Sequence, residues 1–361
     1  SCYYLNVERN QYKFSLKENL NKRFADRRAS VKKEDVEKLV LEEIQKVFPP
    51  IENIERVFFP EKSNQISDRP VVTLIVVGPE QSIQDDSAIS KKIDSMTKEY
   101  GNSARTYKSA LIWIAPESAV SMREEARKLM AWTDIEGEGL KLDDAQEKQL
   151  TENIKKAKRD LRESVWRAYN KVMFLGRDNA IRTIDLGLVT SSAAENMCRF
   201  VLNHLRQIDE IVKDVSPRSL IKNWPPAFTE WATRSVRDAF YASPQFPRLL
   251  NPEAIKDAIG RGVAEGLMAY VGKSLKGGYE PFYYKKPLTS TEVEISDDMF
   301  IIKAEEAEKH IKPPELTRII VSPSTAYVQP GKKQTFTAKG LDQFSRDIGL
   351  GEMEWSSTGG V

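Results

Sequence analysis

The sequence predicts an α/β fold with a partly parallel or mixed sheet, joined to mainly helical segments. The first indication is the apolar run at residues 70–77 (PVVTLIVV), which is typical of a strand covered on both faces. A second such run lies at 109–115 (SALIWIA), and a helical pattern at 87–100 separates the two. Strand, helix and strand at this spacing predict a β-α-β unit.

Amphipathic helices are expected on both sides of this unit. At 31–47, apolar residues recur every three or four positions, and Pro49 and Pro50 end the pattern. A long charged helix is expected from Asp143 to about Leu175. The other expected elements are a strand at 56–59, helices at 122–132 and 192–212, and a strand or extended link at 180–188. This order predicts an α/β region at 1–133 and a helical region at 134–215.

Residues 216–312 form a region of shorter elements that we interpret as a winged-helix-like module. Helices are expected at 217–223 and 225–241, and a third begins at Asn251-Pro252 and runs to about Val271. After the Gly277-Gly278 turn, the expected strands lie at 279–286 and 291–295. Helices followed by a hairpin are typical of a winged helix, which can read DNA or pack against protein.

The first strand of that hairpin carries candidate nucleic-acid contacts. Tyr283 and Tyr284 stand directly before Lys285 and Lys286. Basic side chains on a hairpin can bind phosphate while the aromatic rings contact sugar or base. The alternative is a solvent-facing strand edge with no ligand.

The chain changes character after the Pro313-Pro314 linker. Residues 316–361 show short alternating strands and resemble the start of a bacterial immunoglobulin-like domain of group 2. The matching features are Val321-Ser322-Pro323, Pro330-Gly331, Thr335-Phe336-Thr337-Ala338 and Trp355-Ser356-Ser357. A sandwich of this class needs about seven strands, and roughly four are expected here. We therefore expect an incomplete domain at 313–361, and a chain that is a fragment of a larger protein.

Composition limits the function classes. With 40% hydrophobic and 30% charged residues among 361, the chain can form cores under a charged surface. The net charge of +2 means that any nucleic-acid patch must be local. Cys2 and Cys198 are expected to be reduced thiols of a cytoplasmic protein, with Cys198 buried. No apolar run is long enough for a membrane span, and no signal peptide opens the sequence.

One segment is similar to a phosphate-binding loop. Gly266 and Gly272-Lys273-Ser274 are separated by five residues, whereas the loop requires four. We interpret the segment as a helix that ends at Gly272. His204 and His310 have no ligand-type neighbours at metal-binding spacing. We expect no catalytic, cofactor-binding or metal-binding residue in this chain.

Several segments carry a wider resemblance that covers roughly residues 10–310. They are Tyr12–Lys22 (YKFSLKENLNK), Arg105–Pro116 (RTYKSALIWIAP), Arg127–Trp132 (RKLMAW) and the long helix that contains Tyr169. Together they resemble the C-terminal half of a family of large bacterial AAA+-type ATPases, commonly labelled as a domain of unknown function. Its members occur beside DNA methyltransferases and helicases in phage-defence islands, and the phage-growth-limitation (BREX) ATPase is similar.

The resemblance implies that ATP and Mg²⁺ bind in a parent protein, upstream of residue 1. It implies that Arg105 is a charge-sensing or inter-subunit arginine; the alternative is a surface residue. Implied partners are DNA and the methyltransferase or helicase components of a defence system, within an oligomer. Two hypotheses follow. The first is a non-catalytic C-terminal region that couples ATP hydrolysis to DNA or partner binding, and the second is a protein–protein scaffold without a nucleic-acid role.

Overall fold

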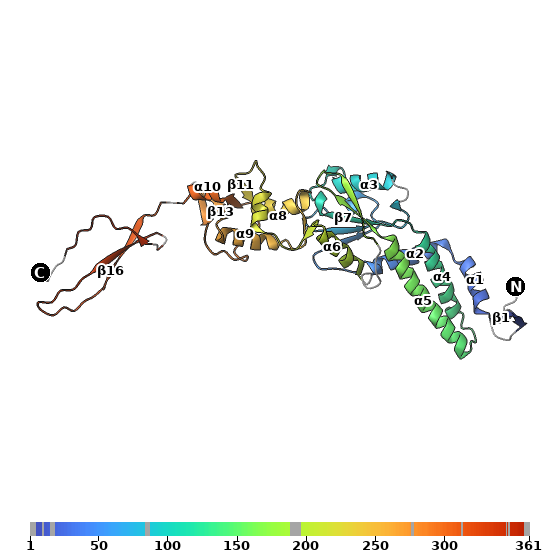
Figure 1. Ribbon diagram of the computed structural model, residues 1–361. Helices are drawn as coiled ribbons and strands as arrows, with labels where there is room; N and C mark the ends of the chain where they lie inside the picture. Colours follow the sequence, from blue (N-terminus) through green and yellow to red (C-terminus); the bar gives the residue numbers. More distant parts are fainter. Residues whose placement is uncertain are drawn as a thin grey trace.

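The computed structural model is elongated, with helices α1, α4 and α5 at one end and a β-extension at the other (Figure 1). Two bodies lie between these ends: a central α/β body and a second body of short helices and strands. The structure describes residues 5–8, 11–14, 19–83, 87–187, 196–275, 278–311, 313–343, 345 and 347–356. The first short strands, β1 (Leu5–Glu8) and β2 (Gln11–Phe14), pair with each other antiparallel.

The central body is built on a five-stranded mixed sheet, as expected. Its order is β3 (Glu55–Phe58), β4 (Thr73–Val76), β7 (Leu111–Ala115), β8 (Lys171–Leu175) and β9 (Ile181–Asp185). Strands β3, β4 and β7 are parallel to one another, whereas β8 is antiparallel to both of its neighbours, β7 and β9. Helix α3 (Ser87–Lys98) joins β4 to β7, which confirms the predicted β-α-β unit. Both strands are buried throughout, and this explains their uninterrupted apolar runs.

Four helices extend the central body into an arm. They are α1 (Leu20–Ser30), α2 (Lys33–Val47), α4 (Val120–Gly137) and α5 (Asp144–Ala168). Helices α4 and α5 pack along each other, and α1 joins them where Phe24 stacks on Trp132 with ring centroids 4.3 Å apart. The prediction that the long helix reaches Leu175 is wrong. Its C-cap is Tyr169, whose hydroxyl donates to the Val77 carbonyl at 2.7 Å, and the next apolar run forms β8.

The second body combines short helices with an antiparallel sheet of order β11-β15-β13-β14. Its helices are α7 (Pro217–Lys222), α8 (Thr233–Ala242), α9 (Ala254–Ala264) and α10 (Ala304–Lys309). Helix α6 (Met197–Gln207) lies against the central body, below β7 in the view of Figure 1. Its sheet strands are β11 (Glu230–Ala232), β13 (Met268–Lys273), β14 (Tyr279–Tyr283) and β15 (Met299–Lys303).

Three sequence predictions fail in this body. Helix α9 ends at Ala264, and Gly266 takes a φ of +71°, so the apolar residues that follow form β13 and not more helix. Residues 291–295 are not a strand; β14, the first strand of the predicted hairpin, pairs with the preceding strand β13, whose other neighbour is β15. The predicted helix at 225–241 begins only at Thr233, after the short strand β11.

The two bodies share one apolar core, which runs from Leu20 on α1 to Ile301 on β15. Polar contacts reinforce the junction: the Tyr107 hydroxyl donates to Asp238 at 3.0 Å, and strands β10 (Ile211–Val212) and β12 (Arg248–Leu249) pair in parallel. The side chain of Arg248 reaches the end of β8, where it donates to the Leu175 carbonyl at 2.9 Å. The junction is therefore packed and hydrogen-bonded, in contrast to a linker.

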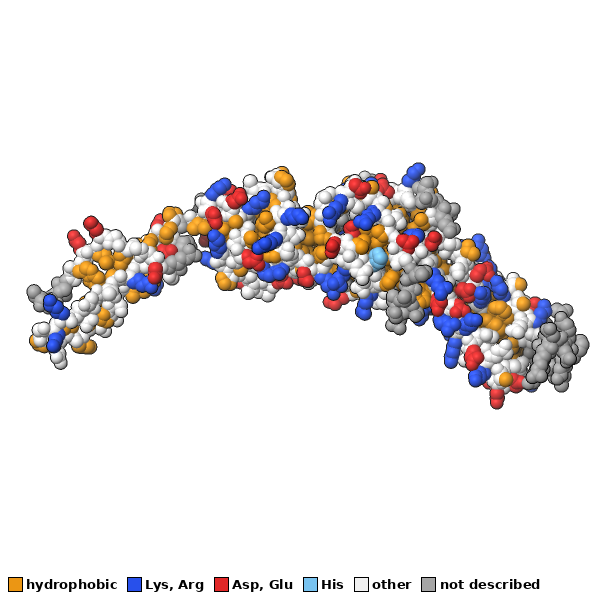
Figure 2. All heavy atoms as spheres, viewed as in Figure 1, with side chains coloured by type: hydrophobic (Ala, Val, Ile, Leu, Met, Phe, Trp, Pro, Cys, Tyr) orange, Lys and Arg blue, Asp and Glu red, His pale blue; other side chains and the backbone are white. Residues whose placement is uncertain are grey.

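The C-terminal extension is a three-stranded antiparallel sheet with little core. Its strands are β16 (Leu316–Ser322), β17 (Thr337–Asp342) and β18 (Asp347–Ile348). Every residue of β16 is exposed, and Ile319 and Trp355 are 52% and 55% exposed. Figure 2 shows hydrophobic side chains on the surface of this segment. Within the described residues, no helix combines the length and the apolar character that crossing a bilayer needs.

Candidate functional site: a groove between three helices

A hollow lies on the arm, between α2, α4 and α5. Its volume is about 880 Å³. The floor is apolar and consists of Leu39 from α2 with Leu129 and Met130 from α4. Leu39 and Met130 are half-buried, so they remain within reach of a ligand that enters the groove.

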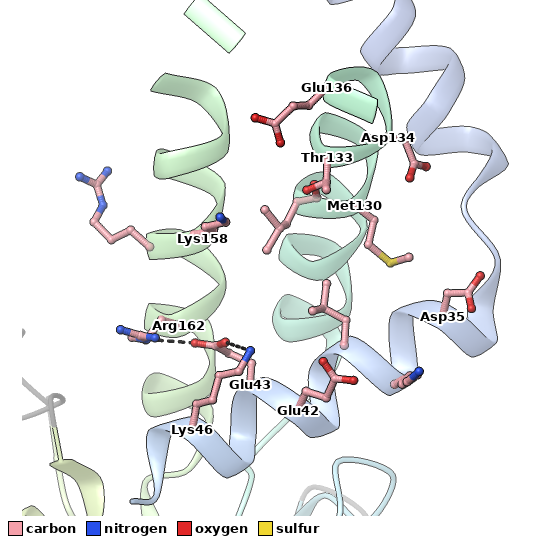
Figure 3. A pocket seen from close by; sticks show the side chains of 14 residues that line it. Asp35, Glu42, Glu43, Lys46, Met130, Thr133, Asp134, Glu136, Lys158 and Arg162 are labelled. Atoms are coloured by element: carbon pink, nitrogen blue, oxygen red, sulfur yellow. Dashed lines mark hydrogen bonds and ion pairs between the residues drawn. The ribbon is translucent and has the colours of Figure 1, made fainter. Parts of the chain in front are cut away.

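The two long walls carry opposite charge. Helix α5 lines the groove with Lys158, Arg159 and Arg162. Helix α4 lines it with Asp134 and Glu136. Figure 3 shows Glu136 extending from α4 toward α5. Among the described residues, no ion pair engages Lys158 or either α4 carboxylate, and all three side chains are exposed.

A buried carboxylate fixes the base of the groove. Glu43 of α2 is 7% exposed, and it accepts a hydrogen bond from Arg162 Nε of α5 at 3.0 Å. The ammonium of Lys46 lies 3.6 Å from the other carboxylate oxygen (Figure 3). Because a buried carboxylate is costly without partners, this arrangement holds α2 against α5 at a defined distance. The remaining α2 charges at the rim, Asp35, Lys38 and Glu42, are mixed in sign.

The groove has the chemistry of a binding surface. Its polar lining consists of lysines, arginines, carboxylates and one hydroxyl side chain, Thr133. Across the described ranges of the chain, no group of three His, Cys, Asp or Glu residues could hold a metal ion. An apolar floor between charged walls is the geometry that accepts an amphipathic helix.

Arg105, the predicted sensor, is buried in the central body. It is 3% exposed, and its guanidinium donates to the carbonyls of Ser63, Ile66 and Ser67 at 2.8–3.1 Å. Burial lowers the pKa of Arg105, and the charge of Asp68 opposes that shift. These contacts give Arg105 a structural role in ordering the loop before β4. Its role as a charge sensor stays a prediction.

The predicted nucleic-acid residues lie on and after β14, where Glu308 of α10 engages two of them. The Tyr284 hydroxyl donates to Glu308 at 3.0 Å, and Lys285 Nζ donates to the same oxygen at 3.2 Å. The hydrogen bond that Lys285 donates to Glu308 raises the pKa of Lys285, while burial raises that of Tyr284. Tyr283 packs against Tyr270, with ring centroids 6.1 Å apart.

Both tyrosines are engaged in contacts within the chain. Tyr284 is 6% exposed, so its ring cannot stack on a base. Lys286 is exposed, but it too has an interaction within the chain. Nucleic-acid binding at these four residues stays a prediction. The contacts of Tyr283, Tyr284 and Lys285 within the chain agree with the alternative in one respect, that this strand edge binds no ligand.

The segment similar to a phosphate-binding loop is the strand β13. Gly272 pairs with Met299 of β15, and Lys273 forms an ion pair with Glu230 at 2.7 Å. The predicted helix end at Gly272 is therefore wrong. The reason is that a strand buried on both faces and a buried helix give similar apolar patterns over so short a run.

The remaining residues singled out from the sequence have structural partners. Cys198 is buried on α6, as expected, and burial raises the pKa of its thiol to about 12. His310 contacts Glu306 at 3.3 Å and packs edge-on against Tyr279. Cys2 lies outside the described residues.

Comparison with protein families, curated proteins and solved structures finds no match to this chain. The groove therefore has to be interpreted from its own geometry. Sequence reasoning did not identify it, although two signals were present. Lys158, Arg159 and Arg162 recur at helical spacing on α5, and Leu39 belongs to the apolar face expected at 31–47.

Proposed function

We propose that this chain is a non-catalytic coupling region that binds a helix of a partner protein in the groove between α2, α4 and α5. The observation that carries the proposal is the apolar floor of Leu39, Leu129 and Met130 between walls of opposite charge. An amphipathic helix places an apolar stripe on such a floor. This develops the scaffold hypothesis and the partner-binding part of the coupling hypothesis.

Charge complementarity defines the partner helix. One edge of its apolar stripe carries Asp or Glu and faces Lys158 and Arg159 of α5. The other edge carries Lys or Arg and faces Asp134 and Glu136 of α4. Rim charges of this kind set orientation and association rate more than affinity, so the apolar floor supplies most of the binding energy.

The parent protein in this proposal is the AAA+-type ATPase of the phage-defence family, a cytoplasmic assembly that binds ATP and Mg²⁺ outside this chain. Its methyltransferase or helicase components are candidate partners. The continuous core between the two bodies supports a coupling role, because a packed junction transmits a displacement that a flexible linker would absorb.

The second body is proposed to be a winged-helix-type module used for packing against protein. Helices α7 to α9 precede the antiparallel pair β13 and β15, with β11 added at the edge. The exposed positions of α9 include Asp257, Arg261 and Ala264, a small surface with balanced charge. That surface suits a protein contact better than a DNA groove. The extension from Leu316 is proposed to be part of an immunoglobulin-like domain.

The test uses a designed amphipathic peptide of about five helical turns, with a Leu stripe, one Glu edge and one Lys edge. Binding is measured by fluorescence anisotropy. Met130→Glu places a charge in the floor and is expected to weaken binding at least about tenfold. Lys158→Glu with Arg159→Glu makes both walls acidic. It should therefore weaken binding of this peptide and strengthen binding of a second peptide that carries Lys on both edges.

The matched control is Lys155→Glu with Lys156→Glu, which makes the same charge change on exposed positions of α5 that do not line the groove. It should leave binding of the peptide unchanged. The proposal fails if the wild-type chain does not bind the peptide, or if the control weakens binding as much as the α5-wall variant does.

A further inference from the structure

A second hollow lies along helix α6. It is formed by two adjoining depressions of about 450 and 590 Å³. Both are lined by Asn203, Arg206, Lys213 and Asp214, so they form one continuous surface that we name the α6 cleft. The segment before β3 and the residues after β12 complete its lining.

Cationic and amide side chains follow one stripe of α6. Arg199, Asn203 and Arg206 are exposed and stand four and three residues apart, which places them on one helix face. At the rise of an α-helix, the outer two are separated by about 10 Å along the axis. Lys213 continues the line beyond β10, and α6 itself contains no acidic residue.

The charges of this stripe are available to a ligand. Within the described part of the chain, no ion pair engages Arg199, Arg206 or Lys213. The neighbouring arginines differ in this respect, because Arg182 and Arg248 both pair with Glu210. Arginine, lysine and asparagine are among the side chains that contact nucleic-acid phosphates.

The lining also indicates the form of nucleic acid. No aromatic residue lines either depression, so the cleft lacks the stacking surface that proteins use to bind single strands. A double helix presents its phosphates outward and keeps its bases stacked inside. We propose that the α6 cleft binds the phosphate backbone of double-stranded DNA, without sequence preference.

Two carboxylates lower the positive charge of this cleft, and their removal should change DNA binding in the direction opposite to removal of the arginines. Glu52 and Asp214 also line the cleft. If the ligand is a polyanion, removing these charges tightens binding, while removing the arginines weakens it. This inference does not depend on the helix-binding groove, because the two sites share no lining residue.

The experiment measures binding of a random-sequence DNA duplex by fluorescence anisotropy over a series of salt concentrations. Arg199→Ala with Arg206→Ala is expected to weaken binding at least about tenfold at low salt and to reduce the salt slope by about 2. Glu52→Gln with Asp214→Asn is expected to tighten binding. Lys155→Ala with Lys156→Ala, which removes two exposed cations from the arm, should change neither value.

Three results would overturn the proposal: no duplex binding by the wild-type chain at low salt, an unchanged salt slope in the arginine variant, or equal loss in the Lys155/Lys156 control. A single strand that binds as tightly as the duplex would also refute it. The substituted side chains are exposed or line the cleft, so circular dichroism should show a folded protein in each case. The peptide experiment at the groove separates failure here from failure of the coupling function.

Discussion

Arg248 offers the sharpest test of the packed junction between the two bodies. Its side chain is 2% exposed, donates to the Leu175 carbonyl, contacts Glu210 at 3.3 Å and lies 4.7 Å from the centroid of the Phe174 ring. Arg248→Ala removes a charged donor to a buried carbonyl, a loss of about 1.5–3 kcal/mol. It also removes a desolvated cation–π contact, worth about 1–2 kcal/mol.

These terms add to about 2.5–5 kcal/mol, which overlaps the range of about 3–5 kcal/mol for breaking a buried pair. Glu210 is 20% exposed and keeps Arg182 at 2.9 Å, so the carboxylate is not stranded and the lower half of that range is expected. Urea unfolding followed by tryptophan fluorescence measures the change in the free energy of unfolding. Hydrogen exchange should show faster opening at β8, β10 and β12.

The control for Arg248 shares its partner but differs in burial. Arg182 pairs with the same Glu210 and is 55% exposed, so Arg182→Ala should cost only about 0–1 kcal/mol. Arg248→Met retains most of the side-chain volume and isolates the hydrogen bonds from the cavity. Equal costs for Arg248→Ala and Arg182→Ala would refute the reasoning, because burial would then not decide the strength of the contact.

Three further predictions concern packing and exposure. Gly260→Ala should destabilise the protein, because a Cβ there would lie 2.4 Å from the Leu288 carbonyl oxygen. A Cβ at Gly137 of α4 would meet nothing within 4 Å, so Gly137→Ala should add about 0.5–1 kcal/mol of stability in thermal melts. In a Cys2→Ser background, the folded Cys198 thiol should react far more slowly with a disulfide reagent than the unfolded one. Because its pKa rises from 9.0 to about 12 on folding, stability should fall as pH increases from 9 toward 12. A chain that ends at Ile311 should bind less of a hydrophobic dye than the full chain, because the exposed apolar residues of β16 are gone.

The buried strands of the central body could be predicted because their apolar runs are uninterrupted. β4 and β7 are covered on both faces, so nearly every residue is apolar, and runs of this short length favour strands over helices. The same property misled the prediction at β13. There, Val263, Leu267 and Val271 continue the i, i+4 spacing of α9, and nothing in that spacing reveals that Gly266 turns the chain. The deciding factor is the pairing with β15, in which Tyr270 lies opposite Ile301, 31 residues further along the chain.

The groove could not be predicted because it depends on three helices that are distant in sequence. Leu39 and Met130 resemble core residues in their own helices, and only the positions of α2, α4 and α5 leave them partly uncovered. The burial of Glu43 likewise could not be predicted from its own helix. It is a charged residue on a charged helix in the sequence, yet the arrival of Arg162 makes it a buried structural contact.

The contrast between Lys285 and Arg199 shows how the structure selects among many similar charges. The chain contains 55 Lys and Arg against 53 Asp and Glu, so almost any cation has a carboxylate nearby in sequence or in space. Lys285 stood out in the sequence because aromatic residues precede it, but Glu308 of α10 engages it. Arg199 and Arg206 drew no attention, yet they face a hollow with no ion-pair partner among the described residues. In a chain of balanced charge, a cluster of cations is a binding candidate only where folding has left it unpaired, and that condition separates the α6 cleft from the strand edge at β14.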